Sequence, residues 1–369
     1  MEVISNFTEG RNNPDFAIPL LTVAIPTWNR ADKLRKLLLA FVEQIEGDQL
    51  SGIVEIFVSD NGSTDSTPVV CREFSGQIRS VRHAENAGFD ANVWSCYQQA
   101  GGQYVLFFSD DDVPEPSLLR TVTRLVTCYQ PAVMLYSFLQ PPHTADSPTI
   151  DINTEFLRTT DAQSALRYLV KFAKLSTYCI RKRIWSKEEI CELTAKLGTD
   201  YFFISLAVFA FLKEQLRGCL LHRAPLARCS EGYNVGFRFA PTVFANRGRA
   251  ADIGNFREVA PADLILSLDA DPVATSLKYL RDHYMGEFAF AQDALAQGER
   301  FIWQHPAQLL TIDRVFLTID YCTAKYIRKR LFRNWVMNMT PILRRIVGRI
   351  RNLSQFRRLS RRARRVEIS

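Results

Sequence analysis

Three consecutive carboxylates, Asp110, Asp111 and Asp112, follow an apolar stretch at residues 104–108. Adjacent carboxylates repel one another, so such a run costs stability unless a cation neutralises it. Mg²⁺ and Mn²⁺ bind carboxylate oxygens and are usually shared with substrate phosphates. The motif therefore favours a divalent-metal site for a phosphate-bearing ligand. The alternative is a solvated acidic turn that caps a helix expected from Ser117.

A second polar cluster, residues 59–65, follows the apolar stretch at residues 54–58. Asp60 can accept hydrogen bonds from a ring N–H of a base or from ribose hydroxyls. Gly62 permits a tight turn with free backbone N–H groups. The alternative is an ordinary turn in which Ser63 or Thr64 caps the next helix, and the two interpretations are compatible.

Two further clusters lie near the start of the chain. Residues 26–30, Pro-Thr-Trp-Asn-Arg, contain no glycine, which argues against a phosphate wrapped at a helix N-terminus as in dinucleotide-binding folds. No P-loop motif occurs anywhere in the chain. Residues 82–92 combine side-chain amides with a glycine turn, which by itself is a weak signal.

The elements that must position these clusters alternate along the first 140 residues. Short apolar runs, typical of buried strands, alternate with segments of helical periodicity. Strands are expected at 20–25, 54–58, 78–83, 104–108 and 132–138, with helices between them. This alternation predicts an α/β fold, a mostly parallel sheet with helices on both faces. Ligands bind at the carboxyl ends of such strands, and every cluster lies at one of those ends.

The rest of the chain mixes helix and strand. An apolar helix is expected after Gly198-Thr199-Asp200, and residues 230–249, rich in Gly, Asn and Arg, are expected to form a loop. Two domains are predicted, 1–250 and a helical C-terminal extension at 251–369. Other expected elements are helices at 162–175 and 187–197 and strands at 177–180 and 218–228.

Four motifs occur in register: IPTWNR, VSDNGSTD, ENAGFDAN and YVLFFSDDDVPEP. In order and spacing the chain resembles family 2 glycosyltransferases of the GT-A fold, well over residues 20–138 and loosely to 228. It is most similar to the bacterial branch that builds surface polysaccharides and includes abequosyltransferase-like enzymes. The resemblance implies inverting, metal-dependent sugar transfer from a nucleoside-diphosphate sugar, UDP- or dTDP-type favoured. The acceptor would be a lipid-linked or polysaccharide hydroxyl, and the cofactor Mn²⁺ or Mg²⁺.

The resemblance also implies roles for individual residues. The acidic metal-binding motif of the family can be aligned with residues 109–112 in two ways, and Asp111 is an acid of the motif in both. Asp111 is therefore expected to bind the metal. Asp110 and Asp112 would support it, and Asp110 would also face the donor. Asn86, and less directly Asn92, would lie near the donor. The base, the ribose and the loop that holds them would involve Pro26, Thr27, Asn29, Arg30, Asp60, Gly62 and Ser63.

An inverting enzyme needs a carboxylate that deprotonates the acceptor hydroxyl from the side opposite the diphosphate. Asp200 lies about where the family places this acid, although Thr199 stands where a Glu is common. The alternative for Asp200 is the N-cap of the following helix. Glu231 is the second candidate for the base.

The net charge of +7 is unevenly distributed. Residues 325–365 hold 15 Lys and Arg and no Asp or Glu, which leaves 31 basic against 39 acidic residues elsewhere, a net charge of −8. An apolar stripe beside the arginines, with Trp335 and Phe332 nearby, predicts a helix in an anionic membrane interface. A helix packed on the acidic body or on a partner is the alternative, and no nucleic-acid partner is expected.

The compartment is inferred from what the sequence contains. Its eight cysteines are scattered without metal spacing, and neither a secretory signal nor a run of about 18 apolar residues is found. We expect reduced thiols, a cytoplasmic protein and peripheral attachment to the inner face of the plasma membrane.

Two other functions fit the same residues less well. A sugar-nucleotide nucleotidyltransferase shares the fold class, but usually has a Gly-rich, basic loop where this chain has IPTWNR. A non-catalytic module that binds membrane or partner on a GT-A fold would not need three intact acids at the metal position.

Overall fold

The computed structural model describes residues 18–139, 148–171, 174–229 and 241–270, without the side chains of 241–245. The chain divides into two compact units, one of residues 1–231 with 246–265 and one of residues 232–245 with 266–369. The elements that build the site belong to the first unit. Glu231 and the basic segment 325–365 lie outside the described residues, and the expected domain boundary after residue 250 stays a prediction.

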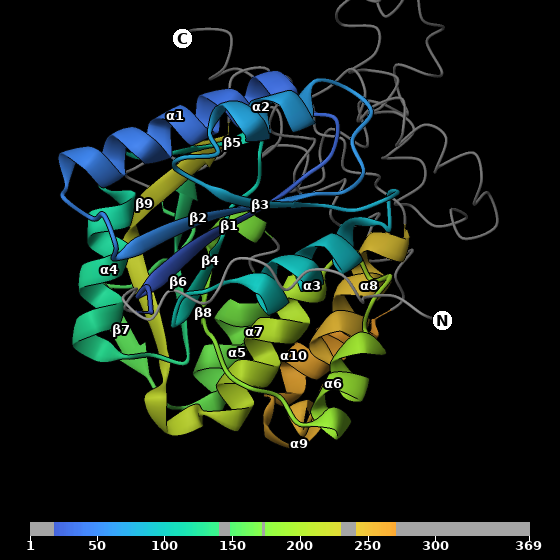
Figure 1. Ribbon diagram of the computed structural model, residues 1–369. Helices are drawn as coiled ribbons and strands as arrows, with labels where there is room; N and C mark the ends of the chain where they lie inside the picture. Colours follow the sequence, from blue (N-terminus) through green and yellow to red (C-terminus); the bar gives the residue numbers. More distant parts are fainter. Residues whose placement is uncertain (1–17, 140–147, 172–173, 230–240, 271–369) are drawn as a thin grey trace, which may run out of the picture. The chain divides into compact units, whose positions relative to one another are not determined.

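The described residues form a nine-stranded sheet with the order β3-β2-β1-β4-β8-β6-β9-β5, in which β7 also pairs with β9 (Figure 1). The strands are β1 Leu21–Thr27, β2 Val54–Asp60, β3 Arg79–Arg82, β4 Tyr104–Phe107, β5 Asp112–Pro114, β6 Val133–Leu139, β7 Phe156–Thr159, β8 Tyr178–Arg181 and β9 Cys219–Cys229.

The sheet has a parallel part and a mixed part. Strands β3, β2, β1 and β4 run parallel, β8 is antiparallel to both β4 and β6, and β6 is again parallel to β9. The predicted α/β class and the predicted strands are confirmed. Strands β5 and β7 were not predicted; they are only three and four residues long and pair antiparallel with the eleven-residue β9.

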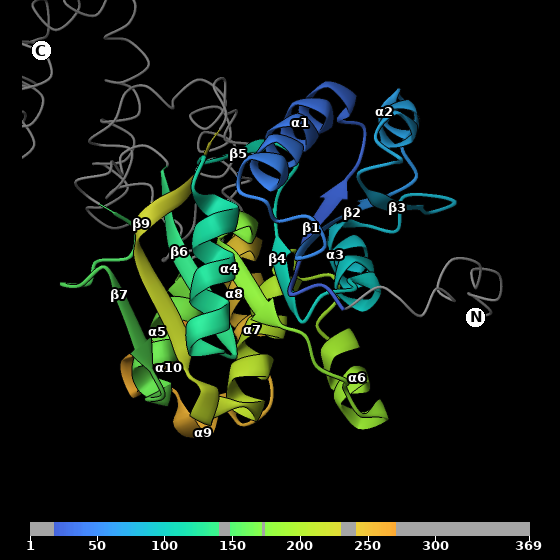
Figure 2. The same cartoon turned by 60° about the vertical axis from the view of Figure 1, so that its left-hand side comes forward.

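Helices cover both faces of the sheet, as predicted. In Figures 1 and 2, α1 (Ala31–Gly47), α2 (Thr67–Glu73) and α4 (Leu118–Tyr129) lie on one face. On the other face lie α3 (Phe89–Gln99), α5 (Ala162–Lys171) and α7 (Phe202–Lys213). Shorter helices are α6 (Lys187–Thr194), α8 (Pro241–Ala251), α9 (Phe256–Val259) and α10 (Ala262–Asp269).

Helix α8 corrects the expectation of a loop at residues 230–249, over the part that the structure describes. Its first residue is Pro241, and proline suits the first helical position because the N–H that it lacks would have no partner there. The Gly and Asn content that suggested a loop is tolerated in a helix, at a cost of about 1 kcal/mol for a glycine.

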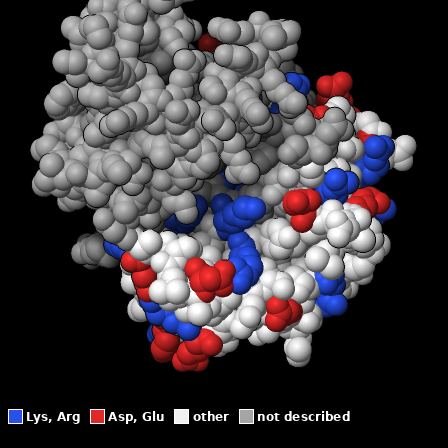
Figure 3. All heavy atoms as spheres, turned by 180° about the vertical axis from the view of Figure 1, so that it is seen from behind, with Lys and Arg blue, Asp and Glu red and all other residues white. Residues whose placement is uncertain are grey.

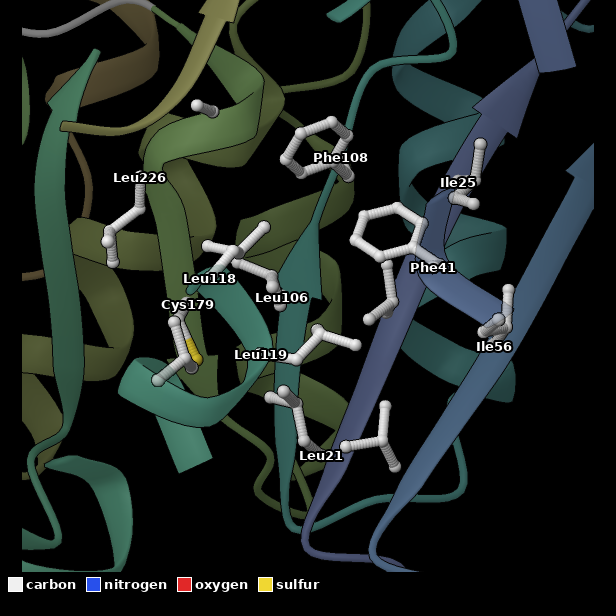
Figure 4. Packing of buried hydrophobic residues seen from close by; sticks show 14 of the residues in the cluster. Leu21, Ile25, Phe41, Ile56, Leu106, Phe108, Leu118, Leu119, Cys179 and Leu226 are labelled. Carbon is white, nitrogen blue, oxygen red and sulfur yellow. The ribbon is translucent and has the colours of Figure 1, made fainter. Parts of the chain in front are cut away.

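The core between α1 and the sheet follows from the spacing of apolar residues. Leu34, Leu37, Leu38 and Phe41 recur on one helical face and are all buried. The ring of Phe41 meets the ring of Phe108 edge to face, with centroids 5.1 Å apart (Figure 4). Burial of each such side chain contributes roughly 1.5–3 kcal/mol. This packing fixes α1, and the turn before it, against the ends of β1 and β4.

Helix α7 is apolar on all sides, and its residues from Phe202 to Phe211 are buried. The prediction of a buried helix after Asp200 is therefore confirmed.

Across the part of the chain that the structure describes, no helix combines the length and hydrophobicity needed to cross a membrane. On the face shown in Figure 3, Lys and Arg side chains are interspersed with Asp and Glu side chains.

Candidate functional site

Three strand ends bring the polar clusters together at one edge of the sheet. Thr27 ends β1, Asp60 ends β2 opposite Thr27 in the ladder, and the acidic run follows β4. The Thr27 hydroxyl donates a 2.7 Å hydrogen bond to Oδ2 of Asp110. The clusters at 26–30, 59–65 and 109–112 therefore meet, as the parallel order of β2, β1 and β4 requires.

Asp110 joins the first and third of these clusters rather than facing outward. Its side chain is only 9% exposed, and Nη1 of Arg30 lies 3.9 Å from its Oδ1. Burial raises the pKa of Asp110 to about 6, although the Thr27 hydrogen bond and the Arg30 charge act in the opposite direction. The geometry gives Asp110 a supporting place behind the surface of the site.

Asp111 is the carboxylate of the run that faces outward, with 26% of its side chain exposed. Its Oδ2 lies 3.0 Å from Nη1 of Arg30 and 3.9 Å from Nζ of Lys33. Ser109 donates a 2.7 Å hydrogen bond to its Oδ1. Burial alone would raise its pKa, but the Ser109 hydrogen bond and Arg30 lower it below the usual value. Asp111 is therefore held as an accessible anion.

Asp112 is anchored inside the protein. Its side chain is 1% exposed, and its oxygens contact the Ser176 hydroxyl at 2.6 Å and Nζ of Lys174 at 3.5 Å. Burial raises its pKa. Ser176 also accepts a hydrogen bond from the backbone N–H of Ser109, at 2.9 Å. Neither Ser176 nor Lys174 was a candidate from the sequence, because no motif marks them.

The donor set fits a divalent ion that is shared with a ligand. Within the described ranges, no group of three or more His, Cys, Asp or Glu side chains converges to hold a metal by itself. The oxygens of Asp111 contact Ser109 and Arg30, but its side chain remains 26% exposed, whereas the oxygens of Asp112 are engaged and its side chain is 1% exposed. A metal bound by Asp111 would therefore complete its coordination with phosphate oxygens and water.

Asp60 engages one oxygen in a hydrogen bond and leaves the other, which is buried, without one. Its Oδ1 accepts a 2.9 Å hydrogen bond from the Ser63 N–H. Its Oδ2 is buried and has no hydrogen-bond partner among the described residues, although Nε of Arg82 lies 3.4 Å away without hydrogen-bond geometry. Since buried polar atoms are normally satisfied, this oxygen is suited to a donor group on a ligand.

The turns after β1 and β2 are tied to each other. The Asn29 N–H donates to the Ser63 hydroxyl at 2.8 Å, and Oδ1 of Asn29 accepts from the Thr64 N–H at 2.7 Å. Asn29 adopts φ +53°, a left-handed conformation that Asn tolerates better than most residues. Pro26 pairs with Ser59 in the ladder between these strands. The predicted nucleotide-binding residues of the two turns thus form one structure.

Gly62 allows the loop after β3 to approach. It has φ +69°, and a Cβ added there would lie 2.7 Å from the backbone carbonyl carbon of Glu85. Beside it, Nδ2 of Asn61 donates to Oδ1 of Asn86 at 2.9 Å. Its own Oδ1 accepts from the Ala87 N–H at 3.0 Å. Asn86 is thus positioned by Asn61, which lies within the second motif but was not among the predicted site residues.

Asn92 bridges two strands from inside the protein. It is buried on α3, and its Nδ2 donates to the backbone oxygens of Ser59 at 3.0 Å and Thr27 at 3.4 Å. Asn92 therefore lies at the base of the site, where it holds together the ends of β1 and β2, and its place near the donor stays a prediction.

Asp200 lies at the turn before α7, with its side chain exposed. Its carboxylate accepts no hydrogen bond from any described residue, and its backbone has φ +60°. Its N–H donates to Oδ2 of Asp90 at 2.9 Å. The N-cap of α7 is Tyr201, and the N–H of Phe202, the first residue of the helix, donates to the carboxylate of Asp90, so the N-cap alternative for Asp200 is wrong.

Known proteins are similar to this chain in sequence. Residues 22–182 match the model of the family described as glycosyl transferase family 2. The abequosyltransferase RfbV of Salmonella typhimurium is 28% identical over 240 residues, 59% of this chain and 68% of that protein. The glycosyltransferase GlyA of Streptococcus pneumoniae is 31% identical over 123 residues, 32% of this chain but only 17% of that protein.

A solved structure is similar at lower identity. S. aureus TarS 1–349, in complex with UDP-GlcNAc, has a TM-score of 0.47 and 15% identity, and the match covers 84% of this chain and 92% of that one.

Proposed function

We propose, from the premise that residues 22–182 of this chain belong to glycosyl transferase family 2, that the protein transfers a sugar from a nucleoside-diphosphate sugar to a saccharide hydroxyl in the synthesis of a cell-surface polysaccharide. The observation that carries the proposal is the meeting of Thr27, Asp60 and the acidic run at one edge of the sheet. This edge combines an acceptor for a nucleoside with an anion for a metal and its diphosphate.

The nucleoside would bind at Asp60. Uracil and thymine carry a ring N–H between two carbonyls, and this group could donate to Oδ2 of Asp60, which accepts no hydrogen bond from the described residues. Pro26, Thr27, Asn29 and Arg30 line the adjoining turn, with Gly62 and Ser63 shaping the loop and Asn86 beside it. These contacts support a UDP- or dTDP-sugar as donor.

The diphosphate would lie at Asp111, with Mn²⁺ or Mg²⁺ between them. When bound, the ion offsets the negative charge that develops on the departing nucleoside diphosphate. Arg30 and Lys33, already beside Asp111, supply fixed positive charge to the same group. Asp110 and Asp112 support this position from behind, through Thr27 on one side and Ser176 on the other.

The reaction would invert the configuration of the sugar. Asp200 takes the proton of the acceptor hydroxyl, whose oxygen forms the new bond to the anomeric carbon. The bond from that carbon to the diphosphate breaks, and its electron pair leaves with the nucleoside diphosphate. The carboxylate of Asp200 is exposed and accepts no hydrogen bond from the described residues, which supports this role. Glu231 is the second candidate.

The acceptor would be lipid-linked and reached at the inner face of the plasma membrane. Support comes from the sequence of residues 325–365, whose 15 basic residues and apolar stripe suit an anionic leaflet. A chain truncated after Ala324 should lose flotation with anionic liposomes and keep donor hydrolysis. Unchanged binding of the truncated chain would refute the assignment.

The product released from each donor tests the function. The chain is incubated with UDP-, dTDP- and GDP-sugars, Mn²⁺ and a lipid-linked saccharide. We expect a nucleoside diphosphate and an extended saccharide from one donor. Release of pyrophosphate from a nucleoside triphosphate and a sugar phosphate would indicate a nucleotidyltransferase instead. Absence of product with every donor would favour the non-catalytic module.

A further inference from the structure

We propose that Asp90 is a positioning residue, which holds the turn at residues 198–200 and thereby fixes the carboxylate of Asp200 for its work as base. The inference rests on the proposed function, since it assigns Asp200 that role. Asp90 itself would touch neither the donor nor the acceptor.

The contacts converge from a distant part of the chain. Oδ2 of Asp90 accepts hydrogen bonds from the N–H groups of Thr199 at 2.8 Å and Asp200 at 2.9 Å. Its Oδ1 accepts from the N–H of Phe202 at 3.2 Å. Asp90 is thereby joined to residues more than 100 positions later in the chain.

A helix that starts without a capping side chain needs such a partner. The N-cap of α7, Tyr201, makes no side-chain capping bond, and the N–H of Phe202, the first residue of the helix, donates to Asp90 instead. Asp90 is itself buried in the first turn of α3. Its carboxylate therefore lies at the positive ends of two helix dipoles, which favour its negative charge, although burial and the charge of Asp200 raise its pKa.

The turn that Asp90 holds is conformationally unfavourable. Asp200 has φ +60° and Gly198 has φ +84°, both in the left-handed region. A non-glycine residue persists there when its surroundings impose the conformation. The hydrogen bond from the Asp200 N–H to Asp90 is such a constraint, and it leaves the Asp200 side chain exposed. We call the hydrogen bonds from Thr199, Asp200 and Phe202 to Asp90 the Asp90 lock. The rings of Phe89 and Phe203, which neighbour Asp90 and Phe202 in the sequence, meet edge to face with centroids 6.5 Å apart.

Helix α3 connects the Asp90 lock to the edge of the sheet where the donor would bind. Two residues after Asp90, the amide of Asn92 holds the ends of β1 and β2 through Ser59 and Thr27. One rigid helix therefore contacts both the strand ends that would hold the nucleoside and the turn that would carry the base. The separation between donor and base is set by α3.

The first variant is Asp90→Asn, which keeps the size of the side chain and replaces one acceptor oxygen by an N–H₂ group that faces backbone donors. We expect kcat to fall by about tenfold or more, with KM for the donor and the Kd for UDP within about twofold of wild type. The matched control is Glu188→Gln, an exposed carboxylate in the first turn of α6 whose side chain bonds locally to Ser186. It should leave all three constants unchanged. A rise in donor KM without loss of kcat would overturn the inference.

A double-mutant cycle separates positioning from general damage. If Asp90 acts through Asp200, then Asp90→Asn should cause no further loss of rate in an Asp200→Asn background. A further loss by the same factor would contradict the proposal. If Asp90→Asn does not fold, Asp90→Glu keeps the charge one methylene farther out, and the same cycle is run with it.

Amide hydrogen exchange tests the Asp90 lock without a measurement of enzyme activity. Exchange at Thr199, Asp200 and Phe202 should accelerate in Asp90→Asn while the amides of β1 and β2 remain protected. Unchanged exchange at these three amides would refute the lock. A wild-type chain without transfer to any acceptor would instead refute the proposed function, and the exchange result would still decide whether Asp90 holds the turn.

Discussion

Nη1 of Arg30 lies 3.0 Å from Oδ2 of Asp111, so a guanidinium from the turn after β1 holds a carboxylate that follows β4. The pair links the two strand ends whose relation the sequence motifs only implied. Because Asp111 is part-exposed and Arg30 is more so, we assign this contact a role in arranging charge and little weight in stability.

Asp111→Asn is predicted to remove the metal dependence of nucleotide binding. The amide retains the shape of the carboxylate but loses the charge that would hold a divalent ion. Titration of the chain with UDP by calorimetry, with and without Mn²⁺, should show metal-enhanced affinity in the wild type and none in the variant. Sugar transfer should fall by about a hundredfold or more.

The neighbouring variant Asp112→Asn is predicted to affect stability instead of metal binding. It should lower the free energy of unfolding by about 2 kcal/mol, because it disturbs a buried carboxylate that Ser176 and Lys174 satisfy. Mn²⁺-dependent UDP binding should remain in the folded fraction. If Asp112→Asn abolished it and Asp111→Asn did not, the assignment of the metal ligand would be reversed.

Asp60→Asn is predicted to weaken nucleotide binding while sparing the fold. Oδ1 of the amide can still accept from the Ser63 N–H, but an N–H₂ group then replaces the open Oδ2 acceptor. Affinity for the matching nucleoside diphosphate should fall by roughly 10- to 100-fold, or about 1.4–2.8 kcal/mol. Asp65→Asn, an exposed position on the same loop, is the control. Equal loss in both variants would argue against a direct contact of Asp60 with the nucleoside.

Gly62→Ala is predicted to destabilise the protein, by about 1–3 kcal/mol in the free energy of unfolding. The added Cβ would meet the backbone of Glu85 at 2.7 Å, and φ is +69°. Gly76→Ala is the matched control, since a Cβ there meets nothing within 4 Å. Urea unfolding of both variants checks the difference. Equal midpoints would mean that the loop at Glu85 yields without cost.

Glu55 should make stability depend on pH. Burial alone would raise its pKa, but the hydrogen bonds from Arg79, Thr22 and Gly101 bring it below the usual value. A lowered folded-state pKa contributes stability that is present above the unfolded-state value, about 4.3, and lost as pH falls through the folded-state value.

Glu55→Gln therefore tests this dependence. It should lower the free energy of unfolding by about 1–2 kcal/mol at pH 7. The gap between variant and wild type should narrow below about pH 4. Chemical unfolding at pH 7, 5 and 3.5 measures it, and a gap of constant size would count against the ionic contribution.

The order of strands and helices could be predicted from the sequence because their signals are local. The apolar spacing of Leu34, Leu37, Leu38 and Phe41 defines α1, and the polar residues after β1, β2 and β4 predict a common edge because parallel strands end together. The same reasoning correctly identified α7 as a buried helix.

What the sequence could not predict depends on contacts between distant residues. Ser176, which positions both Ser109 and Asp112, lies in no motif, and its role arises only when β8 pairs with β4. The strand β5 is too short for a periodic signal and exists through its pairing with β9. Asp90 likewise reads as an ordinary first-turn acid until α3 and α7 meet.

The hydrogen bonds that Asn29 makes to Ser63 and Thr64 have a consequence for the thermodynamics of binding. Two separate loops would have to be ordered by an incoming nucleotide, at a cost of about 0.5–1.5 kcal/mol for each side chain immobilised. Here the loops already form one unit in the folded chain. If the proposed function holds, a nucleotide would meet a preassembled site, and its affinity would not be reduced by the conformational entropy of ordering these loops.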